Sequence, residues 1–188
     1  MPLFSVPWPA QGLYTNGEIA TVDDLSGLRF RAYNAALEQF AQLAKAAPVQ
    51  VEAPDIAQAF STGQVEAMMT SPSTGANSKA WDYVNTYTAV DAWLPKNIVV
   101  VNKKMFDRLP EDVQAAVLDA AAAAETRGWS AAEADEKKAE MEANGMAIVA
   151  PSDDLMNGLK AIGATMMDDW KTSASEAGQK ILTDYEAK

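Results

Sequence analysis

Between positions 28 and 70, segments with two different spacings of hydrophobic residues follow one another along the chain. An alternation with period two indicates strands, and apolar residues spaced by three or four indicate helices with one buried face. The pattern predicts, in order, a strand, a helix, a strand, a helix and a strand over residues 28–33, 35–46, 49–52, 54–63 and 65–69. This order predicts a parallel sheet with right-handed crossovers, and therefore an α/β protein.

Local signals support both predicted helices. Asn34 is in the position of an N-cap residue, and Leu37, Phe40 and Leu43 are spaced to form one buried face. In the second helix, Pro54 suits the first turn and Gly63 suits the end. Residues 1–20 show no such periodicity and are predicted to be extended, with breaks at Gly12 and at Asn16–Gly17.

The chain after residue 96 is predicted to be mostly helical. A β-branched run at 97–102 predicts one buried strand. Residues 110–144 begin with proline and acidic residues and are predicted to form one helix, because only Gly128 could interrupt them. Such a helix would be about 51 Å long, more than one small domain needs, and is expected to brace two lobes or two chains.

A short strand at 146–149 and two C-terminal helices complete the predicted elements. The first of these helices has an apolar stripe, and the second covers 175–185. The stripe consists of Leu155, Leu159, Ile162, Met166 and Trp170. Met156, Met166 and Met167 are expected to lie in the core.

Composition excludes several functional classes. The 188 residues carry a formal charge of −11, which argues against nucleic acid and anionic membranes as partners. The chain has no cysteine, so disulfides and thiolate chemistry are excluded, and no histidine, the commonest general base and metal ligand. No nucleotide-binding or metal-binding motif is present, so no cofactor and no metal are expected, and an enzyme is disfavoured.

The first residues resemble neither a signal peptide nor the start of a domain. Residues 1–9 contain three prolines and lack the basic flank and the apolar run of a signal peptide. The sequence is therefore interpreted as starting in mid-domain, as a fragment of a longer protein. No stretch approaches the ~18 apolar residues that indicate a membrane span.

Arg31 is the first candidate for a ligand-binding residue. It lies near the end of the first predicted strand, and open α/β sheets bind ligands beyond the carboxyl ends of their strands. Its planar guanidinium group suits a carboxylate. Arg29 lies two residues earlier, where surface charge or an ordinary ion pair is the better interpretation. Asn34 is included in the candidate site because it follows the same strand directly.

Further candidates come from a hydroxyl-rich run and from the residues around Pro95. Thr70, Ser71 and Ser73 follow the third predicted strand and could hydrogen-bond an anion, although a plain loop is the alternative. Trp93 and Asn97 could contact a ligand, with packing and a turn as the respective alternatives. The carboxylates of residues 111–142 are interpreted as a solvated helix face rather than a metal site.

Five segments occur in an order that resembles a known family. They are Gln11–Thr15, Asp24–Arg31, Ala59–Ala67, Trp93–Lys103 and Leu109–Gln114. In this combination the chain resembles the substrate-binding subunit of TRAP transporters, the DctP family of bacterial periplasmic binding proteins. The resemblance extends over nearly the whole chain.

This resemblance implies a two-lobed periplasmic protein that closes on an organic acid, such as a dicarboxylate, and delivers it to a membrane permease. Arg31 matches the ligand-clamping arginine of the family, whereas the hydroxyls of Thr70 and Ser71 replace an asparagine found in many relatives. Family members also carry a signal peptide and an opening segment of the first lobe, both missing here.

The domain assignment follows from the same resemblance. Residues 1–95 would form most of the second lobe, as a periplasmic-binding-protein-like lobe with a parallel sheet. Residues 96–109 would return to an incomplete first lobe, 110–144 would form the long spanning helix, and 145–188 would form a C-terminal strand and helices.

A different class of function is also considered. The long helix could be the seam of a homodimer, and the chain could then be a helix-mediated interaction protein without a small-molecule ligand. The Ala-, Glu- and Lys-rich stretch lacks sustained apolar heptads, which argues against this alternative.

Overall fold

The computed structural model describes residues 1–93, 95–132 and 135–187. The chain forms two compact units. Unit 1 contains Met1–Tyr14 and Met69–Val149, and unit 2 contains Thr15–Met68 and Ala150–Lys188. Residues 1–95 therefore contribute to both units, and the predicted assignment of segments to the lobes of a receptor stays a prediction.

Unit 2 contains the predicted parallel strands. β3 (Arg29–Ala32) pairs in parallel with β4 (Ala47–Gln50) on one side and with the beginning of β5 (Ala67–Thr70) on the other. The helices between them are α1 (Ala35–Leu43) and α2 (Ile56–Ser61), the latter preceded by the 3-10 turn η2 (Ala53–Asp55). The predicted β-α-β-α-β order is confirmed.

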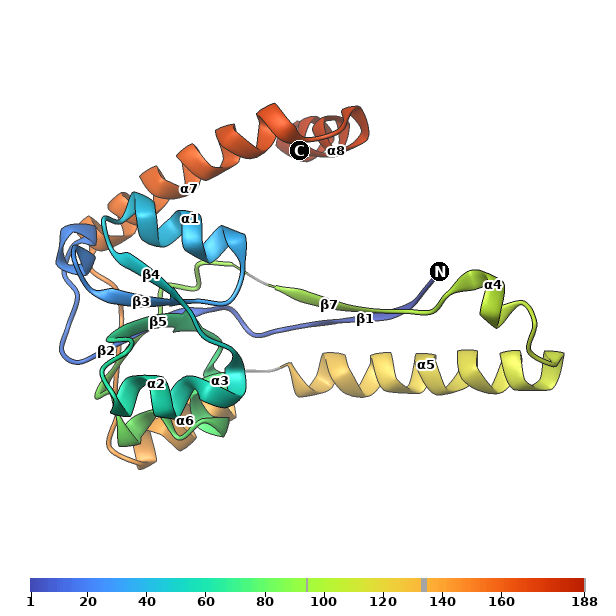
Figure 1. Cartoon of the computed structure of the whole chain (residues 1–188), viewed down its shortest axis with the longest axis horizontal. Coiled ribbons are helices and arrows are strands. Elements are labelled where there is room, and N and C mark those ends of the chain that lie inside the picture. The colour runs from blue at the N-terminus through green and yellow to red at the C-terminus, as the bar shows by residue number, and fades with distance from the viewer. Residues whose placement is uncertain (94, 133–134, 188) are drawn as a thin grey trace. The chain divides into compact units, whose positions relative to one another are not determined.

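The sequence signals act in this unit as expected. The Asn34 side chain caps α1 by accepting a hydrogen bond from the Leu37 amide at 2.9 Å. α1 packs on β3 and β4 (Figure 1), and Phe30 contacts Phe40 with a ring-centroid distance of 5.5 Å. Gly63 follows α2 with φ of +69°, a conformation that glycine adopts at low cost.

The C-terminal helices of unit 2 are more exposed than predicted. α7 (Asp153–Ser173) packs against α1 and the 3-10 turn η1 (Val22–Leu25), and α8 (Glu176–Glu186) follows it. Leu155 is buried, but Trp170 and Met167 are exposed and Met156 and Met166 are only half-buried. The prediction that these methionines lie in the core is therefore wrong, because the described residues of unit 2 cover α7 only partly.

Unit 1 holds a second group of strands. β6 (Thr86–Thr88) pairs in parallel with β8 (Ala147–Val149), and β2 (Gly12–Thr15) is entirely buried. The helices α3 (Pro72–Asn77) and α6 (Asp135–Ala143) pack against each other, and the 3-10 turn η3 (Ala80–Asp82) follows α3.

Gly12 begins β2, although a break was predicted there. A Cβ atom at this position would overlap the Tyr87 ring and lie 2.6 Å from the Thr88 carbonyl oxygen. Glycine is required here because it has no side chain and so allows two chain segments to approach closely. Its conformational freedom is not the reason.

A two-stranded ribbon and a long helix complete unit 1. β1 (Pro2–Pro7) pairs antiparallel with β7 (Lys96–Val100), and α5 (Glu111–Ala131) packs against β1 (Figure 1). Between β7 and α5 lies the short helix α4 (Lys103–Phe106).

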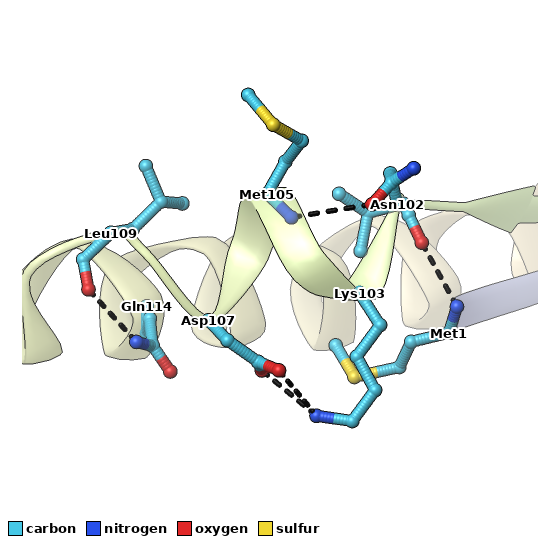
Figure 2. Close-up of polar contacts among 8 residues, drawn as sticks. Met1, Asn102, Lys103, Met105, Asp107, Leu109 and Gln114 are labelled. Atoms are coloured by element: carbon cyan, nitrogen blue, oxygen red, sulfur yellow. Dashed lines mark hydrogen bonds and ion pairs between the residues drawn. The ribbon is translucent and has the colours of Figure 1, made fainter.

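Side-chain hydrogen bonds fix both ends of this connection (Figure 2). Asn102 caps α4 by accepting from the Met105 amide at 3.2 Å, and Lys103 pairs with Asp107 at 2.8 Å. Gln114 Nε2 donates to the Leu109 carbonyl at 2.9 Å and so joins the first turn of α5 to the loop before it.

Two sequence predictions differ from the structure in this region. The strand predicted to be buried, β7, is exposed along its whole length, because β1 is the only strand that pairs with it among the described residues. The single helix predicted over 110–144 is divided into α5 and α6, with the Ala132 amide closing a turn on the Trp129 carbonyl after α5. The predicted length of about 51 Å is therefore wrong.

Candidate ligand-binding site

Arg31 is a buried arginine on the middle strand of the three in unit 2. Its residue is only 2 % exposed, and it lies opposite Val49 of β4 and Met68 of β5. Its Nε donates to the Val51 carbonyl at 3.0 Å, and its Cζ lies 4.8 Å from the centroid of the Tyr33 ring. These contacts orient the guanidinium plane, as recognition of a carboxylate requires.

Arg29 has a different environment on the same strand. Its side chain is 48 % exposed and forms an ion pair with Glu66 at 3.0 Å. The other Glu66 oxygen accepts the Arg29 amide at 3.0 Å. The structure therefore confirms the ordinary ion pair expected for Arg29 and distinguishes the two arginines clearly.

Asn34 has a structural role in unit 2. Asn34 is exposed, and its side-chain oxygen Oδ1 accepts the hydrogen bond that caps α1. The side-chain nitrogen Nδ2 of Asn34 could still donate a hydrogen bond to a ligand. Contact between Asn34 and a ligand stays a prediction.

The hydroxyl-rich run begins a helix and does not form a plain loop. Thr70 ends β5 and is buried, and Ser71 caps α3 by accepting from the Thr74 amide at 3.1 Å. The Ser71 hydroxyl also lies 3.1 Å from that of Thr74. Ser73 is half-buried in the first turn of α3. Pro72 at the first helical position explains why helix formation begins here.

Trp93 and Asn97 lie in different surroundings of unit 1. The side chains of Trp93 and Gln11 are joined by a hydrogen bond from Trp93 Nε1 to Gln11 Oε1 at 3.2 Å. The backbones are joined as well, because the Trp93 carbonyl accepts a hydrogen bond from the Gln11 backbone N–H at 3.2 Å. Asn97 lies on β7 opposite Val6 and is exposed. The turn considered as the alternative for Asn97 is not formed, because the residue belongs to the ribbon, and its contact with a ligand stays a prediction.

Three further polar residues of unit 1, Gln11, Tyr14 and Tyr87, connect the predicted ones. Tyr14 donates from its hydroxyl to the Ser71 carbonyl at 3.0 Å, and its ring contacts the Tyr87 ring edge-on at 4.8 Å between centroids. Gln11 adjoins Gly12, which lies against that same Tyr87 ring. Contacts through β2 therefore link Ser71 with Trp93. Sequence reasoning assigned these residues no role, although Gln11 and Tyr14 belong to a segment that carries the resemblance.

The two buried tyrosines stay protonated. Burial is the main cause that raises the pKa of Tyr14 and of Tyr87, and the nearby Asp91 carboxylate raises the pKa of Tyr87 further. Their hydrogen bonding differs, however. The Tyr14 hydroxyl has a partner in Ser71, whereas the buried Tyr87 hydroxyl has none among the described residues.

This difference predicts that the same substitution has different effects on stability at the two tyrosines. Tyr14→Phe should lower the free energy of unfolding by about 1 kcal/mol, because it leaves the Ser71 carbonyl without this donor. Tyr87→Phe should leave stability unchanged or increase it, because it removes a buried hydroxyl without a partner. Urea unfolding followed by circular dichroism measures both. Equal losses in the two variants would contradict the assignment.

Two further kinds of site were searched for in the described part of the chain. Histidine, cysteine, aspartate and glutamate side chains do not gather there in a group of three or more able to hold a metal ion. Of the helices that the structure describes, none is both long and apolar enough to cross a membrane.

Comparison with known families identifies the class of protein. Residues 10–177 match DctP, the bacterial extracellular solute-binding proteins of family 7. The match covers most of the chain, and the chain belongs to this family. The predicted family and the periplasmic, extracytoplasmic localisation are confirmed. The family consists of solute-binding receptors and not of enzymes. No curated protein matches the chain by sequence.

Solved structures of the same class are closely similar. The extracytoplasmic solute receptors DctP7 and DctP6 of Bordetella pertussis, both binding pyroglutamic acid, are 45 % and 41 % identical, each with a TM-score of 0.95. A TRAP solute-binding protein from a marine metagenome, described as specific for pyroglutamate, is 38 % identical with a TM-score of 0.91.

These matches cover 99 %, 100 % and 100 % of this chain but only 62 %, 63 % and 62 % of the respective structures. The chain thus spans a little over three fifths of the length of these relatives. The agreement confirms the predicted α/β fold of a TRAP periplasmic binding protein.

Proposed function

We propose that the chain is part of a longer receptor, here called the whole receptor, which captures an organic acid outside the cytoplasm and delivers it to a TRAP membrane permease. The observation that supports a carboxylate ligand is the buried Arg31, whose guanidinium is oriented by Val51 and Tyr33. A buried, oriented guanidinium is suited to pair with a carboxylate by two parallel hydrogen bonds. The absence of histidine and cysteine favours binding without turnover.

Pyroglutamate is the acid that we propose as the preferred ligand. Three receptors between 38 % and 45 % identical to this chain bind it according to their descriptions. Pyroglutamate has one carboxylate and a five-membered lactam ring with one N–H donor and one carbonyl acceptor. Arg31 would bind the carboxylate. Asn34, Thr70, Ser71, Ser73, Trp93 and Asn97 remain the predicted contacts for the other polar atoms.

Two further proposals concern partners of the receptor. Delivery to a permease follows from the TRAP relatives, and a homodimer through the long helix follows from the sequence pattern. Val113 and Leu118 on α5 are exposed, and a homodimer formed through this helix would bury these two apolar side chains. Nothing in the fold or the comparisons favours the alternative of an interaction protein without a small-molecule ligand.

A thermal-shift panel on the whole receptor tests this proposal. Pyroglutamate at 100 times its Kd should stabilise the native state by about 2.7 kcal/mol, and so raise the Tm by several degrees. Proline, which lacks the lactam carbonyl, and 2-pyrrolidinone, which lacks the carboxylate, serve as matched controls and should act weakly. Nuclear magnetic resonance of the recovered ligand should show it unchanged. A shift caused only by sugars or cations would contradict the proposal.

A further inference from the structure

The first turn of α3 is held in place by the side chain of Tyr14. The Tyr14 hydroxyl donates to the Ser71 carbonyl at 3.0 Å, and the same carbonyl accepts the Gly75 amide at 3.0 Å within the helix. Tyr14 is completely buried on β2, and its hydroxyl also lies 3.5 Å from Met141 Sδ of α6. One buried hydroxyl therefore connects β2, the beginning of α3 and α6.

Gly75 leaves the space in α3 that this side chain occupies. A Cβ atom on Gly75 would overlap the Tyr14 hydroxyl oxygen and lie 2.6 Å from two atoms of the Tyr14 ring. The ring can approach the helix backbone this closely because glycine has no side chain. Since α3 has only six residues, contacts with other elements contribute more to its position than its own hydrogen bonds do.

Two hydroxyls on either side of the anchored Ser71 carbonyl are available to a ligand. The Ser71 hydroxyl itself is already used, because it accepts the Thr74 amide at 3.1 Å and lies 3.1 Å from the Thr74 hydroxyl. The hydroxyls of Thr70 and Ser73 form no hydrogen bond with the residues that the structure describes. A hydroxyl can both donate and accept, so this pair suits the carbonyl and the N–H of a lactam ring.

We propose that Tyr14 is a positioning residue for ligand selectivity. By fixing the Ser71 carbonyl, it fixes the Thr70 and Ser73 hydroxyls that recognise the lactam group of the ligand. In this role Tyr14 acts through the first turn of α3 and needs no contact with the ligand. The inference rests on the proposed binding of pyroglutamate, and it narrows the predicted contacts of the hydroxyl-rich run to two side chains.

Two acids that share a carboxylate and a five-membered ring test this role in the whole receptor. Cyclopentanecarboxylate lacks the lactam N–H and carbonyl of pyroglutamate, so the ratio of its Kd to that of pyroglutamate measures recognition of the lactam. Tyr14→Phe should lower this ratio about 3- to 10-fold, as expected when a neutral hydrogen bond is lost. Titration calorimetry, by displacement for the weaker acid, measures both Kd values. An unchanged ratio in a folded Tyr14→Phe receptor would overturn the inference, because a purely structural role weakens both acids alike.

A variant without the two hydroxyls shows whether Tyr14 acts through them. Thr70→Val with Ser73→Ala removes both hydroxyls with little change in side-chain size, and should lower the Kd ratio by itself. Tyr14→Phe added to this variant should lower the ratio no further, because residues that act through one another are not additive. A further loss as large as that in the wild-type background would overturn the inference.

Trp129→Phe is the matched control, because it too removes a donor to a backbone carbonyl in unit 1. Trp129 Nε1 donates to the Ser5 carbonyl of β1 at 3.0 Å. This variant should keep the Kd ratio within about twofold of the wild type, and a loss equal to that of Tyr14→Phe would overturn the inference. A wild-type receptor that binds neither acid would refute the proposed function together with this inference. A selective wild type whose selectivity survives Tyr14→Phe would overturn this inference alone.

Discussion

Replacing Arg31 by alanine is expected to weaken binding of the organic acid to the whole receptor by roughly two to three and a half orders of magnitude. Arg31 is buried, and a ligand carboxylate paired with it would lose its hydration. Removing one partner of a buried charge pair typically costs about 3–5 kcal/mol, because the other charge stays buried without compensation. Titration calorimetry with pyroglutamate measures the change in Kd.

Two further variants show how far the affinity depends on the positive charge, on the planar guanidinium group and on the position of the arginine in the strand. Arg31→Lys keeps the positive charge but loses the planar fork and the Nε hydrogen bond to Val51, so it should recover only part of the affinity. Arg29→Ala removes an exposed arginine of the same strand that is paired with Glu66, and should stay within a few-fold of the wild type.

Stability must be measured in parallel, because Arg31 also contributes to the fold. Arg31→Ala loses the hydrogen bond to the Val51 carbonyl and the contact with Tyr33, so circular dichroism should confirm that the variant is folded. Near-wild-type affinity of a folded Arg31→Ala receptor would refute the proposed role. A large loss in Arg29→Ala alone would move the carboxylate contact to that residue.

Truncating Phe30 to alanine is expected to lower the free energy of unfolding of unit 2 by about 3–5 kcal/mol. The Phe30 side chain is 0 % exposed and contacts Phe40 of α1, and it precedes Arg31 on β3. The cost combines the lost burial of the ring with the cavity that remains between β3 and α1. Denaturant unfolding followed by circular dichroism measures it.

Leu43→Ala is the matched control for this truncation. Leu43 ends α1 and is 37 % exposed, so its removal should cost less than half as much. An equal loss in both variants would mean that the β3–α1 contact is not the core of this unit.

The elements between residues 28 and 70 could be predicted because their signals are local. Asn34 caps a helix, Gly63 ends one, and the apolar spacing of Leu37 and Phe40 selects the face that packs on the sheet. Capping, backbone conformation and amphipathic spacing all depend on residues within a few positions of one another. Parallel pairing then followed from the order of the elements, because such crossovers have few alternatives.

The environment of the candidate site depended on contacts between distant segments. The sequence placed Arg31 on a strand, but only the structure shows its Nε bonded to the Val51 carbonyl. Likewise, Tyr14 meets Ser71 and Trp93 meets Gln11 across more than fifty residues of sequence. No periodicity encodes such partners, because they depend on which strands become neighbours.

Burial of the β-branched strand and continuity of the long helix were also decided by tertiary structure. The sequence of β7 suits a buried strand, yet Ile98 and Val100 are exposed, because burial requires a covering layer and not only apolar side chains. Residues 110–144 contain few helix breakers, yet α5 ends at Ala131 after packing on β1, and α6 packs on α3. Helix propensity by itself determined that this region is helical. Packing against two different partners decided where the first helix ends.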